Sequence, residues 1–342
     1  MGPLAAFALA TFLALLLTPL GVRLAWVSGY LDHPEARKLH TSATPLLGGM
    51  VVFVASLAGW LVVTRAAALQ NEVVCLLLGA VVALAVGLWD DRFSMGVGTK
   101  IAGQASAVGL LLASGNVPDL GLPLLANAAI TMIMLVALMN AVNFLDNMNG
   151  IVAGLSAIAL AGFAWSSWER GAYGVASGKL ALAGACAGFL RYNFSFPRAR
   201  IFLGDAGSLL LGYSLGASAV LAWIGLPRGW GQAGPILLIG YPVFDMIFVV
   251  VTRVRAGRHF YVGGRDHSNH RLASLIGCQK RTVMLVWLVG VALCASGFAV
   301  QRLNHLLPTV ALSVLWVTTL LLAGLRLSSV PVQEGGPSPT NP

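Results

Sequence analysis

Residues 73–92 read VVCLLLGAVVALAVGLWDDR. The uncharged stretch from 73 to 89 is followed directly by two carboxylates, Asp90 and Asp91. A helix rises about 1.5 Å per residue, so crossing a hydrocarbon core of about 30 Å takes roughly 20 mostly apolar residues. This stretch therefore predicts a membrane-spanning helix that ends on a pair of acids.

The same apolar character extends over the whole chain of 342 residues. Hydrophobic residues make up 58% of the sequence and charged residues 10%, against about 25% charged residues in a soluble domain. A water-soluble globule could not cover that much apolar surface with so little charge, which excludes an ordinary soluble enzyme, a coiled coil and a disordered chain. We expect a single polytopic membrane domain over residues 1–327 and a disordered cytoplasmic tail over 328–342, where Pro, Gly and Ser accumulate.

Hydropathy predicts an all-α integral membrane protein with about eleven transmembrane helices. The expected spans are 3–22, 46–64, 73–89, 100–116, 120–139, 150–167, 173–190, 207–225, 233–252, 283–301 and 305–325. With the N-terminus outside and the C-terminus in the cytoplasm, Lys and Arg are about three times as frequent in inner as in outer segments, as the positive-inside rule requires. The net charge of +9 then indicates an anionic membrane surface and anionic substrates rather than nucleic acid.

Most acids and every histidine except His305 also fall on the predicted inner side. Acidic side chains contribute little to orientation, so no topology rule places them there. Titratable groups at the ends of several helices on one membrane face indicate a site open to the cytoplasm. The scattered cysteines show no metal-ligand spacing, so structural zinc is not expected.

The first two inner segments carry groups suited to phosphate and metal. Arg37, Lys38 and His40 form a basic cluster that could hold phosphate or could simply be a basic collar at the membrane surface. Asp90 and Asp91 are followed by a lysine at position 100. Adjacent carboxylates are costly without a cation between them, which favours Mg²⁺; the alternative is a solvated acidic turn paired with a neighbouring arginine.

The third inner segment places Asn140, Asn143 and Asp146 three residues apart, so that they share one face if the segment is helical. They could read a sugar or base, or they could join helices by hydrogen bonds. After Asn193, the sequence Gly204-Asp205-Ala206-Gly207-Ser208 opens the next span. A helix N-terminus there could bind phosphate, with Asp205 carrying a metal, or Asp205 could only cap the helix.

The last inner segments contain Asp245 within a span and a basic loop with His267 and His270 three residues apart. An intramembrane carboxylate is either functional or a structural partner for a neighbouring helix. The two imidazoles could bind a metal or a phosphate, and the loop as a whole could instead bind lipid headgroups.

Taken in order, these motifs are specific. The patterns D-x-P-x-x-R-K-x-H, G-x-x-D-D with a following K, N-A-x-N-F-x-D, I-F-x-G-D-x-G-S, P-x-x-D and a His-rich loop alternate with the spans over residues 20–272. The chain resembles the polyprenyl-phosphate N-acetylhexosamine-1-phosphate transferase family, which includes the enzymes that start O-antigen, enterobacterial common antigen and teichoic acid synthesis and the phospho-N-acetylmuramoyl-pentapeptide transferase.

The resemblance implies a reaction in which a polyprenyl phosphate attacks the sugar-bearing phosphorus of a UDP-N-acetylhexosamine. The products would be a polyprenyl-diphospho-sugar and UMP, formed with Mg²⁺, or Mn²⁺ in its place, to initiate cell-envelope polysaccharide synthesis. The expected setting is the bacterial inner membrane, with the active site facing the cytoplasm, the lipid bilayer as partner and a homodimer as the candidate assembly.

The resemblance also implies roles for individual residues. Asp90 would orient or deprotonate the lipid phosphate, and Asp91 would lie near the metal that Asp205 binds. The remaining assignments are His267 and His270 on the diphosphate and sugar, Asp146, Asn143, Asn193 and Phe202 at the uridine end, Lys100, Arg37 and Lys38 against phosphate charge, and His40, Asn140 and Arg271 as further substrate contacts.

Two motifs depart from the family pattern. The usual D-G-x-D-G reads Asp146-Asn147-Met148-Asn149-Gly150, and the usual H-x-H-H reads His267-Ser268-Asn269-His270. Both differences bear on the identity of the sugar and disfavour the pentapeptide branch, so UDP-N-acetylglucosamine is the first choice of donor. A transporter of an anionic lipid or nucleotide sugar is the alternative; it would need polar groups near the midplane and an outer gate, and the outer loops are nearly bare of them.

Overall fold

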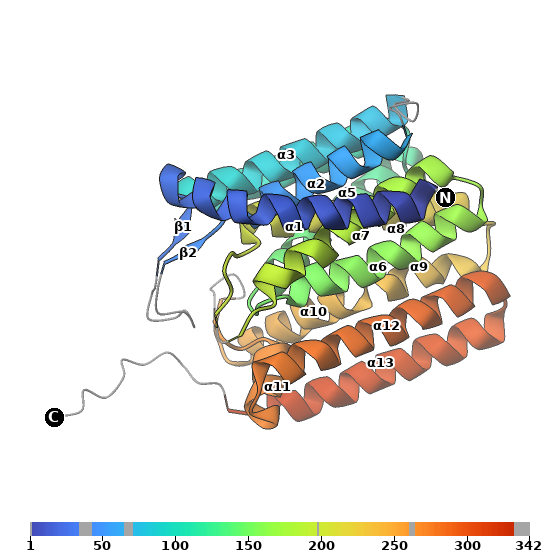
Figure 1. Cartoon of the computed structure of the whole chain (residues 1–342). Coiled ribbons are helices and arrows are strands. Elements are labelled where there is room, and N and C mark those ends of the chain that lie inside the picture. The colour runs from blue at the N-terminus through green and yellow to red at the C-terminus, as the bar shows by residue number, and fades with distance from the viewer. Residues whose placement is uncertain (1, 34–42, 65–70, 197, 260–263, 332–342) are drawn as a thin grey trace.

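The computed structural model describes residues 2–33, 43–64, 71–196, 198–259 and 264–331. These residues form a bundle of long helices that lie side by side, with the N-terminus at one end and the strands β1 and β2 and the helix α11 at the other (Figure 1). The elements are α1 (Gly2–Ser28), β1 (Leu31–Asp32), β2 (Thr44–Pro45), α2 (Gly48–Thr64), α3 (Asn71–Phe93), α4 (Val97–Ala113), α5 (Leu124–Leu145), α6 (Ile151–Glu169), α7 (Tyr173–Asn193), α8 (Gly204–Gly225), the 3-10 helix η1 (Trp230–Ala233), α9 (Gly234–Leu238), α10 (Gly240–Arg255), α11 (Ser268–Ile276), α12 (Gln279–Leu303) and α13 (Leu306–Ser328).

The prediction of an all-α membrane protein is confirmed for the described residues. Eight helices are long and apolar enough to cross a membrane, and the bent pair formed by residues 230–238 and 240–255 makes a ninth candidate. The helices α2 and α4 are apolar but shorter than a full span. Each of the eleven expected spans coincides with one of these helices, while the count of eleven and the orientation stay predictions. The antiparallel two-residue pairing of β1 with β2 was not predicted.

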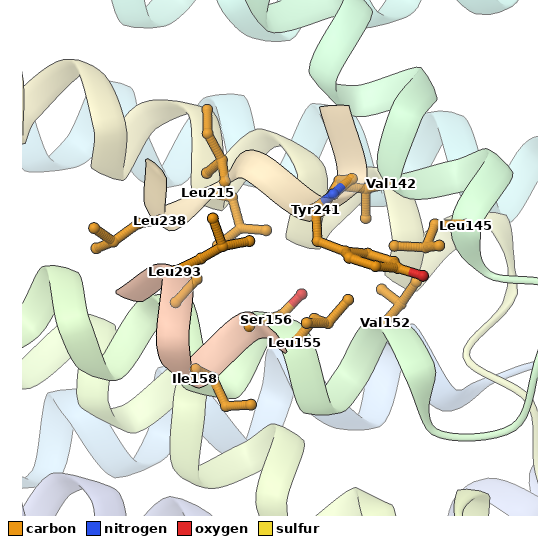
Figure 2. Close-up of a pocket in the computed structure, with 14 residues that line it drawn as sticks. Val142, Leu145, Val152, Leu155, Ser156, Ile158, Leu215, Leu238, Tyr241 and Leu293 are labelled. Carbon is orange, nitrogen blue, oxygen red and sulfur yellow. The ribbon is translucent and has the colours of Figure 1, made fainter. Parts of the chain in front are cut away.

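The bent pair turns by 69° at the break between α9 and α10. Pro242 lies in the first turn of α10, where its missing N–H is tolerated. Figure 2 shows the apolar side chains that close around the inside of this bend, with the Tyr241 ring beside them. The void that remains has a volume of about 10 Å³, roughly the size of one water probe. The bend is therefore packed shut and contains no binding cavity.

Helix α8 is the central element, buried along most of its length, whereas α13 is exposed along nearly all of its apolar surface. Two glycines let other helices approach the first turn of α8. A Cβ added at Gly87 on α3 would lie 2.3 Å from Cα of Ala206, and one added at Gly49 on α2 would lie 2.2 Å from the backbone nitrogen of Gly207. This close approach brings the acidic end of α3 to the N-terminus of α8.

Replacing Gly87 with alanine tests this contact. The added Cβ would meet the α8 backbone, which cannot move aside as a flexible side chain can, and overpacking of this kind costs about 1–3 kcal/mol. We expect Gly87→Ala to lower the midpoint of thermal unfolding in detergent. The control is Gly98→Ala on α4, where nothing lies within 4 Å of the added atom and no loss is expected; equal effects of the two changes would contradict the packing.

Candidate active site

Asp91 joins the end of α3 to the start of α8. Its carboxylate accepts hydrogen bonds from the backbone N–H groups of Asp205, at 2.8 Å, and Ala206, at 3.1 Å. The first N–H groups of a helix lack partners within the helix and carry a partial positive charge, so a carboxylate is well suited to them. Gly204, which precedes them, has φ of +74°, and a Cβ there would lie 2.7 Å from the carboxylate of Asp91. Only glycine meets both conditions without strain.

Lys100, near the start of α4, lies between two of the predicted acids. Its Nζ is 2.7 Å from Oδ2 of Asp90 and 2.8 Å from Oδ2 of Asp205. It also donates to Oδ1 of Asn143 at 3.2 Å. Asp90 is fixed further by the backbone N–H of Met95, at 2.6 Å. We refer to Asp90, Lys100, Asn143 and Asp205 as the lysine cluster; it brings α3, α4, α5 and α8 together.

Asn140 and Asn143 of α5 form hydrogen bonds with different partners. The side-chain amide of Asn143 donates to Oδ1 of Asp205 at 2.7 Å and to the Ser208 hydroxyl at 2.8 Å. Asn140 exchanges hydrogen bonds with Gln104 of α4, at 2.7 and 3.3 Å. Asn143 thus orients a carboxylate, and Asn140 ties two helices together. Gln104 was not predicted as part of the site, although its spacing of four residues after Lys100 puts both on one face of α4.

Asp146 follows directly on α5 and is close enough to Asp205 to be affected by its charge. Burial, and then the negative charge of Asp205, raise the pKa of Asp146 to about 8. In the absence of a bound cation, this carboxyl is therefore largely protonated at neutral pH.

The loop that carries His267 and leads to His270 is anchored by Asp245, which is fully buried on α10. Nδ1 of His267 lies 2.8 Å from Oδ2 of Asp245, whose other oxygen accepts from the backbone N–H of Ser268 at 2.9 Å and from its hydroxyl at 2.5 Å. The rings of His267 and His270 are 6.0 Å apart between centroids. Burial, followed by the neighbouring His267, lowers the pKa of His270 to about 4, so that imidazole is neutral at pH 7.

One hydrogen bond connects this loop to the segment that carries Asp146. The side-chain amide of Asn269 donates to Oδ1 of Asn147 at 2.6 Å. Asn149 donates to the backbone carbonyl of Ser195 at 3.4 Å. At Asn149 and Asn269, where the family pattern has an acid and a histidine, the amide makes a hydrogen bond within the protein.

Three other predicted residues make structural contacts here, and their roles toward a substrate stay predictions. Asn193 is buried, accepts from the Gly150 N–H at 2.8 Å and donates to the Ile201 carbonyl at 3.0 Å. Arg271 donates to three backbone carbonyls, of residues 327, 328 and 330, at the end of α13. The backbone of Phe202 pairs with residues 45 and 48.

The basic residues Arg37, Lys38 and His40 lie outside the described residues. The positions that they would add to the site therefore stay sequence predictions.

The donor set of the lysine cluster fits Mg²⁺ or Mn²⁺. Asp90, Asp205 and Asn143 present carboxylate and amide oxygens, which are the ligands that such hard cations prefer. Within the described ranges, no three acids, histidines or cysteines form a complete metal cage. Mg²⁺ does not need one when one or two carboxylates share it with substrate phosphates.

The low pKa of His270 makes a prediction about stability. Between pH 6.5 and about 4 the unfolded chain binds a proton at this imidazole that the folded chain does not, so its stabilising contribution is present above pH 6.5 and is lost as the pH falls. From pH 7 to pH 5, we expect the free energy of unfolding of the wild type to fall by about 1–2 kcal/mol more than that of His270→Gln. Unfolding in detergent at both pH values measures the difference, and parallel losses would contradict the buried neutral imidazole.

Comparison with known proteins gives consistent matches. The model of the family described as glycosyl transferase family 4 matches residues 73–223, which contain the whole lysine cluster. The chain is 28% identical over 297 residues to a probable undecaprenyl-phosphate N-acetylglucosaminyl 1-phosphate transferase of Bacillus subtilis, covering 83% of this chain and 81% of the relative. It is 30% identical over 296 residues to the decaprenyl-phosphate N-acetylglucosaminephosphotransferase of Mycobacterium tuberculosis, covering 76% and 73%. It is 26% identical over 314 residues to an undecaprenyl-phosphate alpha-N-acetylglucosaminyl 1-phosphate transferase of Escherichia coli, covering 86% and 83%.

Proposed function

The chain belongs to the polyprenyl-phosphate N-acetylhexosamine-1-phosphate transferases of glycosyl transferase family 4, and on this premise we propose that it transfers N-acetylglucosamine 1-phosphate from UDP-N-acetylglucosamine to a polyprenyl phosphate and releases UMP. The observation that carries the proposal is the lysine cluster, in which one ammonium is held between Asp90 and Asp205 at the ends of four helices. The acceptor and the transferred group are those named for the related transferases, which supports the same pair here.

The chemistry suits this arrangement. An oxygen of the lipid phosphate bonds to the sugar-bearing phosphorus, the bond from that phosphorus to the bridging oxygen breaks, and the bridging oxygen leaves with UMP. Both reactants are anions, so the protein must position them and neutralise charge rather than form a covalent intermediate. Lys100 supplies a fixed positive charge, and Asp90 is the group placed to orient the lipid phosphate or take its proton.

Asp205 and the Asn143 amide oxygen are the groups that would hold Mg²⁺ or Mn²⁺, which when bound would neutralise the diphosphate charge. The Asp91 carboxylate accepts a hydrogen bond from the backbone N–H of Asp205 at the α8 N-terminus, and this bond fixes Asp205 in place. His267 is oriented by Asp245, which leaves its other ring nitrogen available to a phosphate or sugar oxygen.

The excess of Lys and Arg in the predicted inner segments supports a site on the cytoplasmic face of a bacterial inner membrane. A water-soluble nucleotide sugar and a membrane lipid can both reach a site only at such an interface. The product would be the first lipid-linked sugar of an envelope polysaccharide.

Replacing Lys100 with methionine tests the charge requirement. With polyprenyl phosphate, Mg²⁺ and a panel of UDP-sugars, the wild type should release UMP most rapidly from UDP-N-acetylglucosamine. We expect Lys100→Met to slow the release by about 10²-fold or more, the usual effect of removing one transition-state charge partner. Lys280→Met is the matched control, because Lys280 is exposed at the start of α12, and it should retain full activity. Lipid-dependent release by Lys100→Met at the wild-type rate would contradict the proposal.

Metal removal is a separate test. A chelator should abolish UMP release, and added Mg²⁺ or Mn²⁺ should restore it. Asp205→Asn should require roughly tenfold more metal for half-maximal rate or lose activity entirely, because a carboxylate ligand becomes a neutral amide. Unchanged turnover in excess chelator would show that no metal acts at this site.

A further inference from the structure

A cavity separate from the lysine cluster lies mainly in the other half of the bundle. It has a volume of about 460 Å³ and lies between α2, α3, α7 and α8. Its lining on α8 runs from Leu210 to Leu221, which lie about 8 Å and about 24 Å along that helix from Asp205. Its walls include Trp60, Leu76, Tyr173 and Tyr213, and Lys179 is the one charged group among the described lining residues. Its volume is typical of sites for small molecules, which range over about 300–1,000 Å³.

Lys179 is unusual for its surroundings. It lies within α7, about 9 Å from the start of that helix, with 7% of its surface exposed. Its Nζ donates to the Ser167 hydroxyl at 2.9 Å and lies 5.8 Å from the centroid of the Phe163 ring.

In the part of the chain that the structure describes, no carboxylate forms an ion pair with Lys179. The charged side chain that acts on it is Arg170, which carries the same sign of charge. An ammonium has three donor hydrogens, and one of them is used. A buried cation is costly without an opposite charge. The proposed reaction does not need this residue, and an external anion would supply the opposite charge that the described residues do not.

We propose that this cavity binds an anionic amphiphile, with a single acidic headgroup on the Lys179 ammonium and its apolar chain along α2, α3 and α8. The apolar walls fit a chain rather than a small hydrophilic anion, and the lone charge fits one acidic group. Tyr173, which is exposed, and Trp60 lie at the wall near the start of α7. Tyr and Trp are enriched where a membrane meets water, which suits entry of a lipid-like molecule there. A fatty-acid carboxylate and a phospholipid phosphate share this chemistry.

Binding to the full chain in a neutral detergent tests the proposal. The probes are oleate, phosphatidylglycerol and, as the uncharged analogue, oleyl alcohol, with thermal stabilisation and native mass spectrometry as readouts. Oleate, phosphatidylglycerol or both should bind at least tenfold more tightly than oleyl alcohol. Binding of oleate alone assigns a carboxylate ligand, and binding of phosphatidylglycerol alone assigns a phosphate headgroup. Equal binding of all three, or of none, would overturn the proposal.

Two variants then locate the binding site. Lys179→Met should weaken binding of the anionic probe at least tenfold, whereas Lys280→Met should leave it unchanged. Leu76→Trp keeps the lysine and fills part of the cavity, so it should also weaken binding. This variant tests the site independently if Lys179→Met does not fold. UMP release should be unchanged in both cavity variants. Undiminished probe binding by a folded Lys179→Met or by Leu76→Trp would place the ligand elsewhere and refute the assignment.

Discussion

The ammonium of Lys100, held between Asp90 and Asp205, is the interaction on which the site depends. Two carboxylates this close repel one another unless a cation lies between them. Asp91 helps to position these groups, because the two hydrogen bonds that it accepts fix the first turn of α8 and therefore the position of Asp205. The lysine thus links the ends of α3 and α8, and an incoming metal and diphosphate would enter a site whose carboxylates are already in place.

The second half of the site rests on a buried carboxylate rather than on a cation. Asp245 holds His267 and the start of α11, and the bond from Asn269 to Asn147 joins this loop to the segment that carries Asp146. The family pattern has a histidine where Asn269 stands and a second acid where Asn149 stands. Both amides form hydrogen bonds within the protein, which gives these two substitutions a structural role.

Much of the fold could be predicted from hydropathy. The apolar run that ends at Asp90 is a helix up to Phe93, and every expected span lies on a helix. The span count could not be settled in the same way, because α2 and α4 are short and one span is bent at the break before Gly240. Hydropathy measures how apolar a segment is and carries no information on a bend.

The sequence predicted the four residues of the lysine cluster as candidates, but it did not predict which of them contact one another. Periodicity placed Asn140 and Asn143 together, yet only the packing of α4 against α5 shows that Asn140 bonds Gln104 while Asn143 bonds Asp205. The use of Asp91 as a cap depends on the close approach at Gly87, a tertiary contact without a local signal. The burial of Lys179 could not be predicted for a related reason, since charge counts along a sequence do not show burial.

The most direct test of the account follows the two phosphorus atoms of the donor. UDP-N-acetylglucosamine labelled with ³²P at the β position, and separately at the α position, would be incubated with the protein, polyprenyl phosphate and Mg²⁺. Transfer of a sugar phosphate predicts that the β label enters the lipid fraction while the α label leaves as UMP. Release of both labels together as UDP would mean that only the sugar is transferred, and it would contradict the reaction proposed for the lysine cluster.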